Sequence, residues 1–120
     1  GKGVELASGI VVDPQFGPLV MVAAGGVLIE LLKDRRFLLP PAGRVSARRA
    51  LDSLASRVML DGVRGAAPSD VEAVVETVAR LSTLASCLGD RIAELDVNPL
   101  IAGPDGCLAV DALVVAKPTA

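Results

Sequence analysis

The sequence predicts an α+β fold in which a mostly antiparallel sheet is covered by two helices. Short apolar runs bounded by Gly, Pro and Asp open and close the chain, and the middle carries apolar residues at helical spacing. The 120 residues, of which 52% are hydrophobic, suffice for one core and are too few for two. Strands at both ends and helices between them are typical of a two-layer domain.

The opening segment predicts a β-hairpin. Residues 4–12 are apolar and β-branched and favour a strand, with a bulge at Ser8-Gly9. Residues 13–18 (Asp-Pro-Gln-Phe-Gly-Pro) are turn formers, and residues 19–23 favour a second strand. Pro40-Pro41 excludes a helix over residues 37–43, which we expect to be a strand end and connector.

Two amphipathic helices are expected in the middle of the chain. The first begins at Ser46 as N-cap and ends near Gly62, and its apolar face is made by Ala47, Ala50, Leu51, Leu54 and Val58. The second begins with a capping box formed by Ser69 and Glu72 and ends at Gly89. Its apolar face comprises Val71, Val74, Val75, Val78, Leu81, Ala85 and Leu88.

Composition argues against several classes of function. The net charge is −2 and no basic cluster is interleaved with aromatic residues, so we do not expect nucleic acid as a partner. The apolar runs are too short to cross a bilayer, which argues against a membrane protein and favours a cytoplasmic one. The chain has no His, so we expect that it does not supply a proton shuttle alone.

The last third of the chain carries a candidate metal site. Asp96 and Asn98 are two residues apart on a predicted strand, so they point to the same face. A Gly/Pro/Asp turn over residues 102–106 predicts an antiparallel hairpin to a strand over residues 107–112, which brings Asp111 beside that face.

Oxygen donors on two adjacent strands suit a magnesium ion chelated by phosphates. Mg²⁺ takes only one or two carboxylates and completes its octahedron with phosphate oxygens and water. Asp96, Asn98 and Asp111 are therefore candidate metal ligands in a Mg-nucleotide site. Asp and Asn also occur at strand ends and turns, where they bond to their own backbone, so the residues alone leave both interpretations open.

Two further residues are candidates for contact with the nucleotide. Arg64 lies between Gly62 and Gly65, where the backbone can approach a ligand and the guanidinium can grip a phosphate with two hydrogen bonds. Glu30 follows Gly25-Gly26 and can support a metal or orient a cation nearby. On the pattern alone, a solvated loop arginine is favoured for Arg64, and a surface or sheet-edge glutamate explains Glu30 at least as well.

The motifs resemble those of a known enzyme family. Residues 96–100 (Asp-Val-Asn-Pro-Leu) and 109–112 (Ala-Val-Asp-Ala) are similar to the acidic-x-Asn-Pro-Leu and Leu-Asp-Ala signatures of NDP-forming acyl-CoA synthetases. Those signatures close the ATP-grasp domain of ADP-forming acetyl-CoA synthetases and of succinyl-CoA synthetase β subunits. Earlier motifs match in the same order, namely Asp13-Pro14-x-Phe16-Gly17-Pro18, Gly25-Gly26-x-x-x-Glu30, Lys33-Asp34 and Gly62-x-Arg64-Gly65.

The resemblance implies that residues 1–116 form the C-terminal subdomain of an ATP-grasp fold and that 117–120 are a tail or linker. It implies Mg²⁺ and ATP or ADP as cofactors, with Asn98 and Asp111 holding the metal, Asp96 in a supporting position and Arg64 on an anion. The family interconverts acyl-CoA, ADP and phosphate with acid, CoA and ATP through acyl phosphate and phosphohistidine intermediates.

The resemblance also implies missing partners. With no His, the chain cannot hold the phosphohistidine, and its start without Met suggests a fragment of a longer parent. The expected partners are the N-terminal half of the ATP-grasp domain and the CoA-binding domains, without which the fragment is expected to be inactive. Ala23-Ala24 precedes Gly25 where the family often has Gly-x-Gly-Gly, and Leu38 replaces a common Arg. The alternative is a structural or subunit-contact module in a degenerate or acyltransferase-fused synthetase.

Overall fold

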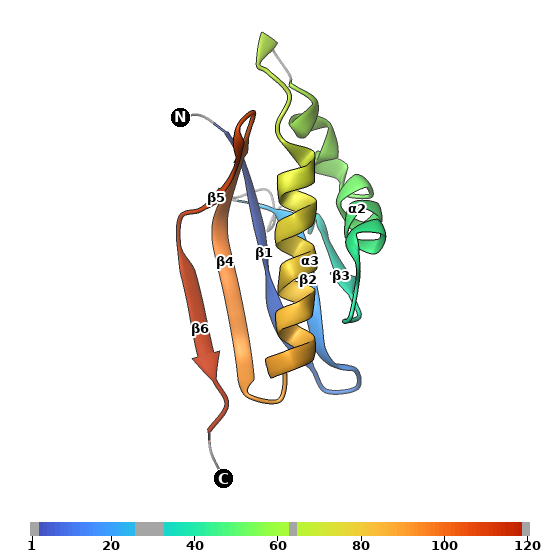
Figure 1. Ribbon diagram of the computed structural model, residues 1–120, viewed down its shortest axis with the longest axis vertical. Coiled ribbons are helices and arrows are strands. Elements are labelled where there is room, and N and C mark those ends of the chain that lie inside the picture. The colour runs from blue at the N-terminus through green and yellow to red at the C-terminus, as the bar shows by residue number, and fades with distance from the viewer. Residues whose placement is uncertain (1–2, 26–32, 63–64, 119–120) are drawn as a thin grey trace.

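A six-stranded antiparallel sheet forms one layer of the molecule, and helices form the other (Figure 1). The computed structural model describes residues 3–25, 33–62 and 65–118. The elements in chain order are β1 (Val4–Asp13), β2 (Gly17–Ala24), β3 (Arg35–Leu38), α2 (Arg44–Asp52), the 3-10 helix η1 (Ala55–Asp61), α3 (Val71–Leu88), β4 (Ile92–Gly103), β5 (Gly106–Ala109) and β6 (Ala112–Ala116). The predicted α+β fold class is confirmed.

The sheet order is β3-β2-β1-β4-β5, and β6 also pairs with β4. β1 pairs with one edge of β4. The other edge of β4 pairs first with β5 and then, further along, with β6 (Figure 1). The predicted hairpins β1–β2 and β4–β5 are both present. Asp13 Oδ1 accepts the N–H groups of Gln15 and Phe16 in the first turn, and Gly17 takes a positive φ of 75°.

One face of the sheet packs against α3 and α2 to form the core. α3 runs along the strands on this face, and α2 lies beside α3 on the same side (Figure 1). The core contains apolar side chains from both layers, among them Leu6, Ile10, Val20, Val22, Leu51, Val74, Val78, Leu95 and Leu100. Among the described residues, no helix is both long enough and apolar enough to span a membrane.

The first helix differs from its prediction. α2 begins at Arg44 with Gly43 as N-cap, so Ser46 lies inside the helix rather than capping it. α2 ends at Asp52, and the chain continues as η1 to Asp61 before Gly62 closes it at a φ of 83°. The predicted end near Gly62 is thus reached in two helices, and Val58, expected on the apolar face, is 57% exposed.

The break between α2 and η1 has a tertiary cause. Asp34, which lies just before β3, is 3% exposed, and its carboxylate accepts the N–H groups of Ala55 and Ser56 at 2.7 and 2.8 Å. Leu54 is extended, with a ψ of 140°, so a new helix starts where a distant carboxylate caps it. The spacing of apolar residues within the helix cannot predict this contact, because Asp34 lies far from Ala55 in the sequence.

The cap of α3 also differs from the predicted capping box. Asp70, rather than Ser69, is the N-cap, and its carboxylate accepts the N–H of Ala73 at 3.0 Å. The Ser69 hydroxyl instead donates to the carbonyl of Ala102 at 3.3 Å, which ties the start of α3 to β4. The predicted apolar face and the end of α3 at Gly89 are confirmed.

Candidate functional site

β4 carries a bulge at Asn98 and Pro99. On either side of the bulge, β1 pairs in register with β4, Leu6 with Leu100 and Ser8 with Val97. Ala7 therefore faces two residues of β4, Asn98 and Pro99, which is one residue more than a regular ladder allows. The predicted bulge at Gly9 is wrong, because Gly9 pairs in register with Met21 on one side and with Asp96 on the other, and the extra residue belongs to β4.

The bulge changes which residues of β4 face the core. Before it, Leu95 and Val97 are buried, and after it the buried residues are Leu100 and Ala102. Asp96 lies between two core residues, so its side chain points to the face that α3 leaves open. Asn98, in the bulge itself, is exposed. The side chains of Asp96 and Asn98 therefore lie outside the core, and β4 still contributes buried apolar residues before and after the bulge.

Asp111 lies directly across from Asn98. It connects β5 to β6 rather than lying inside the strand predicted for residues 107–112, because β5 ends at Ala109. The backbone ladder continues through it, since the N–H of Asn98 donates to the carbonyl of Asp111 at 3.1 Å and Val97 pairs with Ala112. Directly opposed residues hold their Cβ atoms about 5 Å apart. Asp111 is exposed, and its Oδ1 accepts the N–H of Ala112 at 2.9 Å.

The oxygen donors of Asp96, Asn98 and Asp111 suit a metal ion that is already partly coordinated by a bound ligand. Within the described ranges, no three His, Cys, Asp or Glu side chains group closely enough to hold a metal ion by themselves. Asp96, Asn98 and Asp111 offer two carboxylates and one amide, which matches Mg²⁺ that is already bound to phosphates. The same set is a poor match for zinc, which prefers His and Cys.

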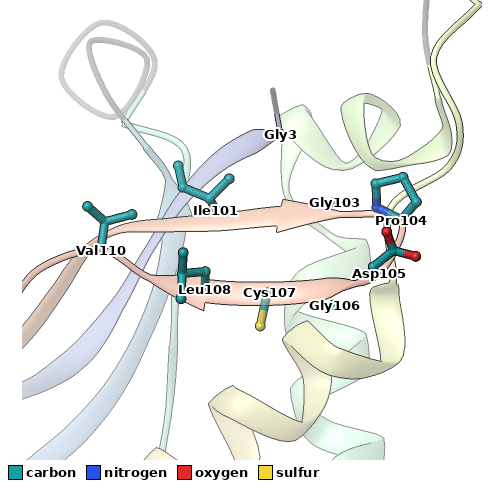
Figure 2. Close-up of a pocket in the computed structure, with 9 residues that line it drawn as sticks. All are labelled: Gly3, Ile101, Gly103, Pro104, Asp105, Gly106, Cys107, Leu108 and Val110. Atoms are coloured by element: carbon teal, nitrogen blue, oxygen red, sulfur yellow. The ribbon is translucent and has the colours of Figure 1, made fainter. Parts of the chain in front are cut away.

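An apolar wall adjoins these polar residues. Ile101 and Leu108 are opposed in register, and Val110 neighbours Asp111. With Gly3 and the hairpin tip at residues 103–107, they line a cavity of about 540 Å³. Figure 2 shows Ile101 and Val110 pointing away from α3, whereas Cys107 points toward it and its thiol lies 3.2 Å from the Thr77 hydroxyl. We did not predict this wall, although alternating apolar residues at 108 and 110 were the available signal.

The two other predicted ligand contacts, Arg64 and Glu30, lie outside the described residues. The elements that flank them are described. Gly25 donates its N–H to the carbonyl of Glu5 at 3.0 Å, and Ser69 donates its N–H to the carbonyl of Leu60 at 2.9 Å. The structure therefore brings together the three predicted metal ligands and does not test the two predicted nucleotide contacts.

A comparison with models of protein families shows which family has this architecture. The model of the ATP-grasp domain matches residues 1–116. The chain belongs to the ATP-grasp family. The similarity noted in the motifs therefore extends over nearly the whole sequence.

Several curated relatives of this ATP-grasp chain are ADP-forming CoA ligases. The β subunit of acetate–CoA ligase [ADP-forming] II from Pyrococcus furiosus is 36% identical over 117 residues, which are 96% of this chain and 50% of the relative. The 4-hydroxybutyrate–CoA ligase [ADP-forming] of Nitrosopumilus maritimus is 40% identical over 99 residues, 82% of this chain and 14% of the relative. The chain spans about half the length of the Pyrococcus β subunits and a smaller part of the longer ligases.

Solved structures show the same fold. Acetyl-coenzyme A synthetase 1 of Ca. Korarchaeum cryptofilum, in complex with coenzyme A and Mg-AMPPCP, aligns with a TM-score of 0.90 and 38% identity. The alignment covers 98% of this chain and 55% of that one. A protein from Pyrococcus horikoshii aligns with a TM-score of 0.90 and 33% identity, covering 99% of this chain and 51% of that one.

Proposed function

We propose that this chain is the Mg-nucleotide-binding half of an NDP-forming acyl-CoA synthetase, in which Asn98 and Asp111 hold the Mg²⁺ of ATP or ADP. The observation that carries the proposal is the register of the terminal strands, which opposes Asn98 to Asp111 on the open face of the sheet. Asp96 lies on the same face and supports the site as a nearby carboxylate. We assign residues 1–116 to one subdomain around this site and residues 117–120 to a tail or linker whose first residue still bonds to Arg91.

The role of these residues is electrostatic. Mg²⁺ bound between phosphate oxygens offsets the charge that develops during phosphoryl transfer, so the protein mainly positions metal and nucleotide. Asn98 and Asp111 would fix the metal from one side, leaving its remaining positions to phosphate and water.

The parent enzyme would interconvert acyl-CoA, ADP and phosphate with acid, CoA and ATP. Support comes from the Pyrococcus furiosus and Nitrosopumilus relatives, which are ADP-forming ligases, and from the Korarchaeum synthetase, which was solved with coenzyme A and Mg-AMPPCP. Because this chain contains no His, the phosphohistidine would come from another part of the parent. That part would also supply the remaining half of the ATP-grasp domain and the CoA-binding domains. We expect the parent in the cytoplasm.

Arg64 and Glu30 complete the proposed site. The guanidinium of Arg64 would contact a phosphate, and the carboxylate of Glu30 would orient a cation near the metal. Both rest on the family motifs and on the residue chemistry. Each is tested separately from the metal ligands by Arg64→Lys and Glu30→Gln, measured as the affinity of the complete parent for Mg-ADP.

Manganese provides a direct test on the chain itself. Mn²⁺ replaces Mg²⁺ with similar oxygen ligands and broadens the NMR signals of nearby nuclei, so even weak binding of Mn-ADP leaves a local signature. We expect the amide signals of Asn98, Asp111 and Ala112 to broaden first. Asn98→Ala and Asp111→Asn should remove this selectivity.

The matched control is Asp105→Asn, at the exposed tip of the β4–β5 hairpin. It removes the same charge from the same hairpin and should leave the broadening unchanged. Broadening centred on Asp105 or spread evenly over the acidic residues would refute the metal assignment. In the complete parent, an unchanged turnover of the Asn98→Ala variant would refute the proposed function.

A further inference from the structure

The outer edge of the sheet is long, apolar and uncovered. β5 and β6 run along β4 over residues 106–116; α3 reaches Cys107 of β5, but it lies over β2 and β1, away from β6 (Figure 1). All five residues of β6 are exposed. They include Leu113 at 56%, Val114 at 59% and Val115 at 41% exposure. A monomer would leave apolar side chains in water on both faces of the same strand.

The two edges of the sheet differ in how they are protected. Proteins usually block exposed edges with charged residues, because an uncharged edge strand pairs with another chain. The β3 edge carries Arg35 and Arg36, both exposed. β6 (Ala-Leu-Val-Val-Ala) has no charged or polar residue at all. The β6 edge is therefore suited to pairing, and the β3 edge is not.

The backbone of β6 presents a regular row of free groups. The carbonyl of Asp111 accepts the N–H of Asn98, and the N–H of Lys117 donates to the carbonyl of Arg91, so the odd-numbered residues bond inward to β4. In an antiparallel ladder the alternate residues point the other way. The N–H and C=O groups of Ala112, Val114 and Ala116 consequently point out of the sheet.

We propose that β6 pairs with β6 of a second copy of this chain, antiparallel and about a two-fold axis at Val114. This register opposes Val114 to itself, Leu113 to Val115 of the second copy, and Ala112 to Ala116. The outward N–H and C=O groups of Ala112, Val114 and Ala116 in one copy then lie opposite the outward groups of the other copy. The apolar side chains of Leu113 and Val115 cover each other on one face, and those of Val114 cover each other on the opposite face.

Charge complementarity selects this register among those that the backbone permits. With the axis at Val114, Asp111 of each copy lies opposite Lys117 of the other, and both residues are exposed. Moving the axis by one residue to Leu113 or Val115 keeps the backbone pairing but separates these charges. Pro118 follows at once and has no N–H to donate, which ends the new ladder after Lys117. The interface is isologous and closes at two copies.

The mass of the chain in solution tests this proposal. Sedimentation equilibrium of the wild type should give twice the 12.2 kDa of one chain. Val114→Lys places two lysines face to face on the axis and should raise the dissociation constant at least about tenfold. Val45→Lys adds the same charge on α2, where Val45 is 67% exposed, and should leave the dissociation constant unchanged.

A charge exchange tests the register independently of Val114. Lys117→Asp should weaken the dimer, and Asp111→Lys combined with Lys117→Asp should restore it, because each pair then has opposite signs again. A single-chain mass at about 1 mM would overturn the proposal, as would growth beyond two copies. A dimer that tolerates Val114→Lys, or a double exchange that fails to restore pairing, would overturn it as well.

Discussion

Replacing Asp34 by alanine should destabilise the protein more than the loss of any exposed carboxylate. Asp34 is 3% exposed and accepts hydrogen bonds from two backbone N–H groups at the start of η1. The Ser56 hydroxyl is buried and forms no hydrogen bond with a described residue, so the backbone N–H of Ser56 makes the contact with Asp34. Asp34→Ala would leave the first turn of η1 without its cap and would loosen α2 from β3.

The expected magnitude follows from these contacts. A hydrogen bond to a charged group contributes roughly 1.5 to 3 kcal/mol, and a lost N-cap costs roughly 0.5 to 2 kcal/mol. Because the two bonds share one carboxylate and one cap, we expect Asp34→Ala to lower the free energy of unfolding by about 3 kcal/mol in total. For a chain of this size, that corresponds to roughly 10 °C in the melting temperature.

Urea denaturation followed by far-UV circular dichroism measures this change. Asp13→Ala is the matched control, because Asp13 also accepts two backbone N–H groups, at 2.7 and 3.0 Å, but in an exposed turn. Water can replace that carboxylate, so the control should lose less than about 1 kcal/mol. Equal losses in the two variants would refute the argument that the buried cap fixes the break between α2 and η1.

Four other predictions concern stability. Burial raises the pKa of Asp34, but hydrogen bonds from Ser56 and Ala55 and the charge of Arg36 outweigh it, so the pKa lies below its ordinary value of 3.8. The loss in Asp34→Ala should therefore be constant from pH 7 to about 5 and become smaller as the pH falls through the folded pKa, which urea titrations at each pH would show. Asp70→Ala should lower the free energy of unfolding by about 1 kcal/mol in the same assay, and Ser69→Ala by less, because the Asp70 carboxylate accepts the Ala73 N–H. A larger loss for Ser69→Ala would show that Ser69 is the N-cap instead. Gly9→Ala should cost about 3 kcal/mol, since its Cβ would lie 2.1 Å from the carbonyl oxygen of Leu95, whereas Gly103→Ala, in open space, should be neutral; equal thermal shifts would contradict this. Leu100→Ala, at 1% exposure, should cost about 3 kcal/mol, and Leu108→Ala, at 66%, less than about 0.5 kcal/mol, again by urea denaturation.

The sequence predicted the elements whose signals are local. The turn at residues 13–18 and the apolar spacing of α3 are written in consecutive residues, so the first hairpin and the long helix were predicted correctly. The break after Asp52 was not, because the carboxylate that caps η1 lies more than 20 positions away in Asp34. Ser69 and Asp70 are both good N-caps, and only the contact of Ser69 with β4 decides between them.

The candidate site was predicted in composition and only partly in geometry. Strand alternation placed Asp96 and Asn98 on one face, and the hairpin placed Asp111 nearby. The bulge opposite Ala7 could not be predicted from the spacing, because it depends on how β1 and β4 align. Asp111 was expected inside a strand but lies between two, at a point where the ladder continues through backbone bonds alone.

The extra residue in β4 lets the same strand present polar side chains on its open face and still bury apolar side chains in the core on either side of them. Asn98 and Asp111 carry none of the packing that holds the layers together. A variant in which either side chain has been exchanged should therefore still fold. Descendants that have lost the chemistry are thus free to persist as scaffolds, and the architecture alone will not distinguish them from working enzymes.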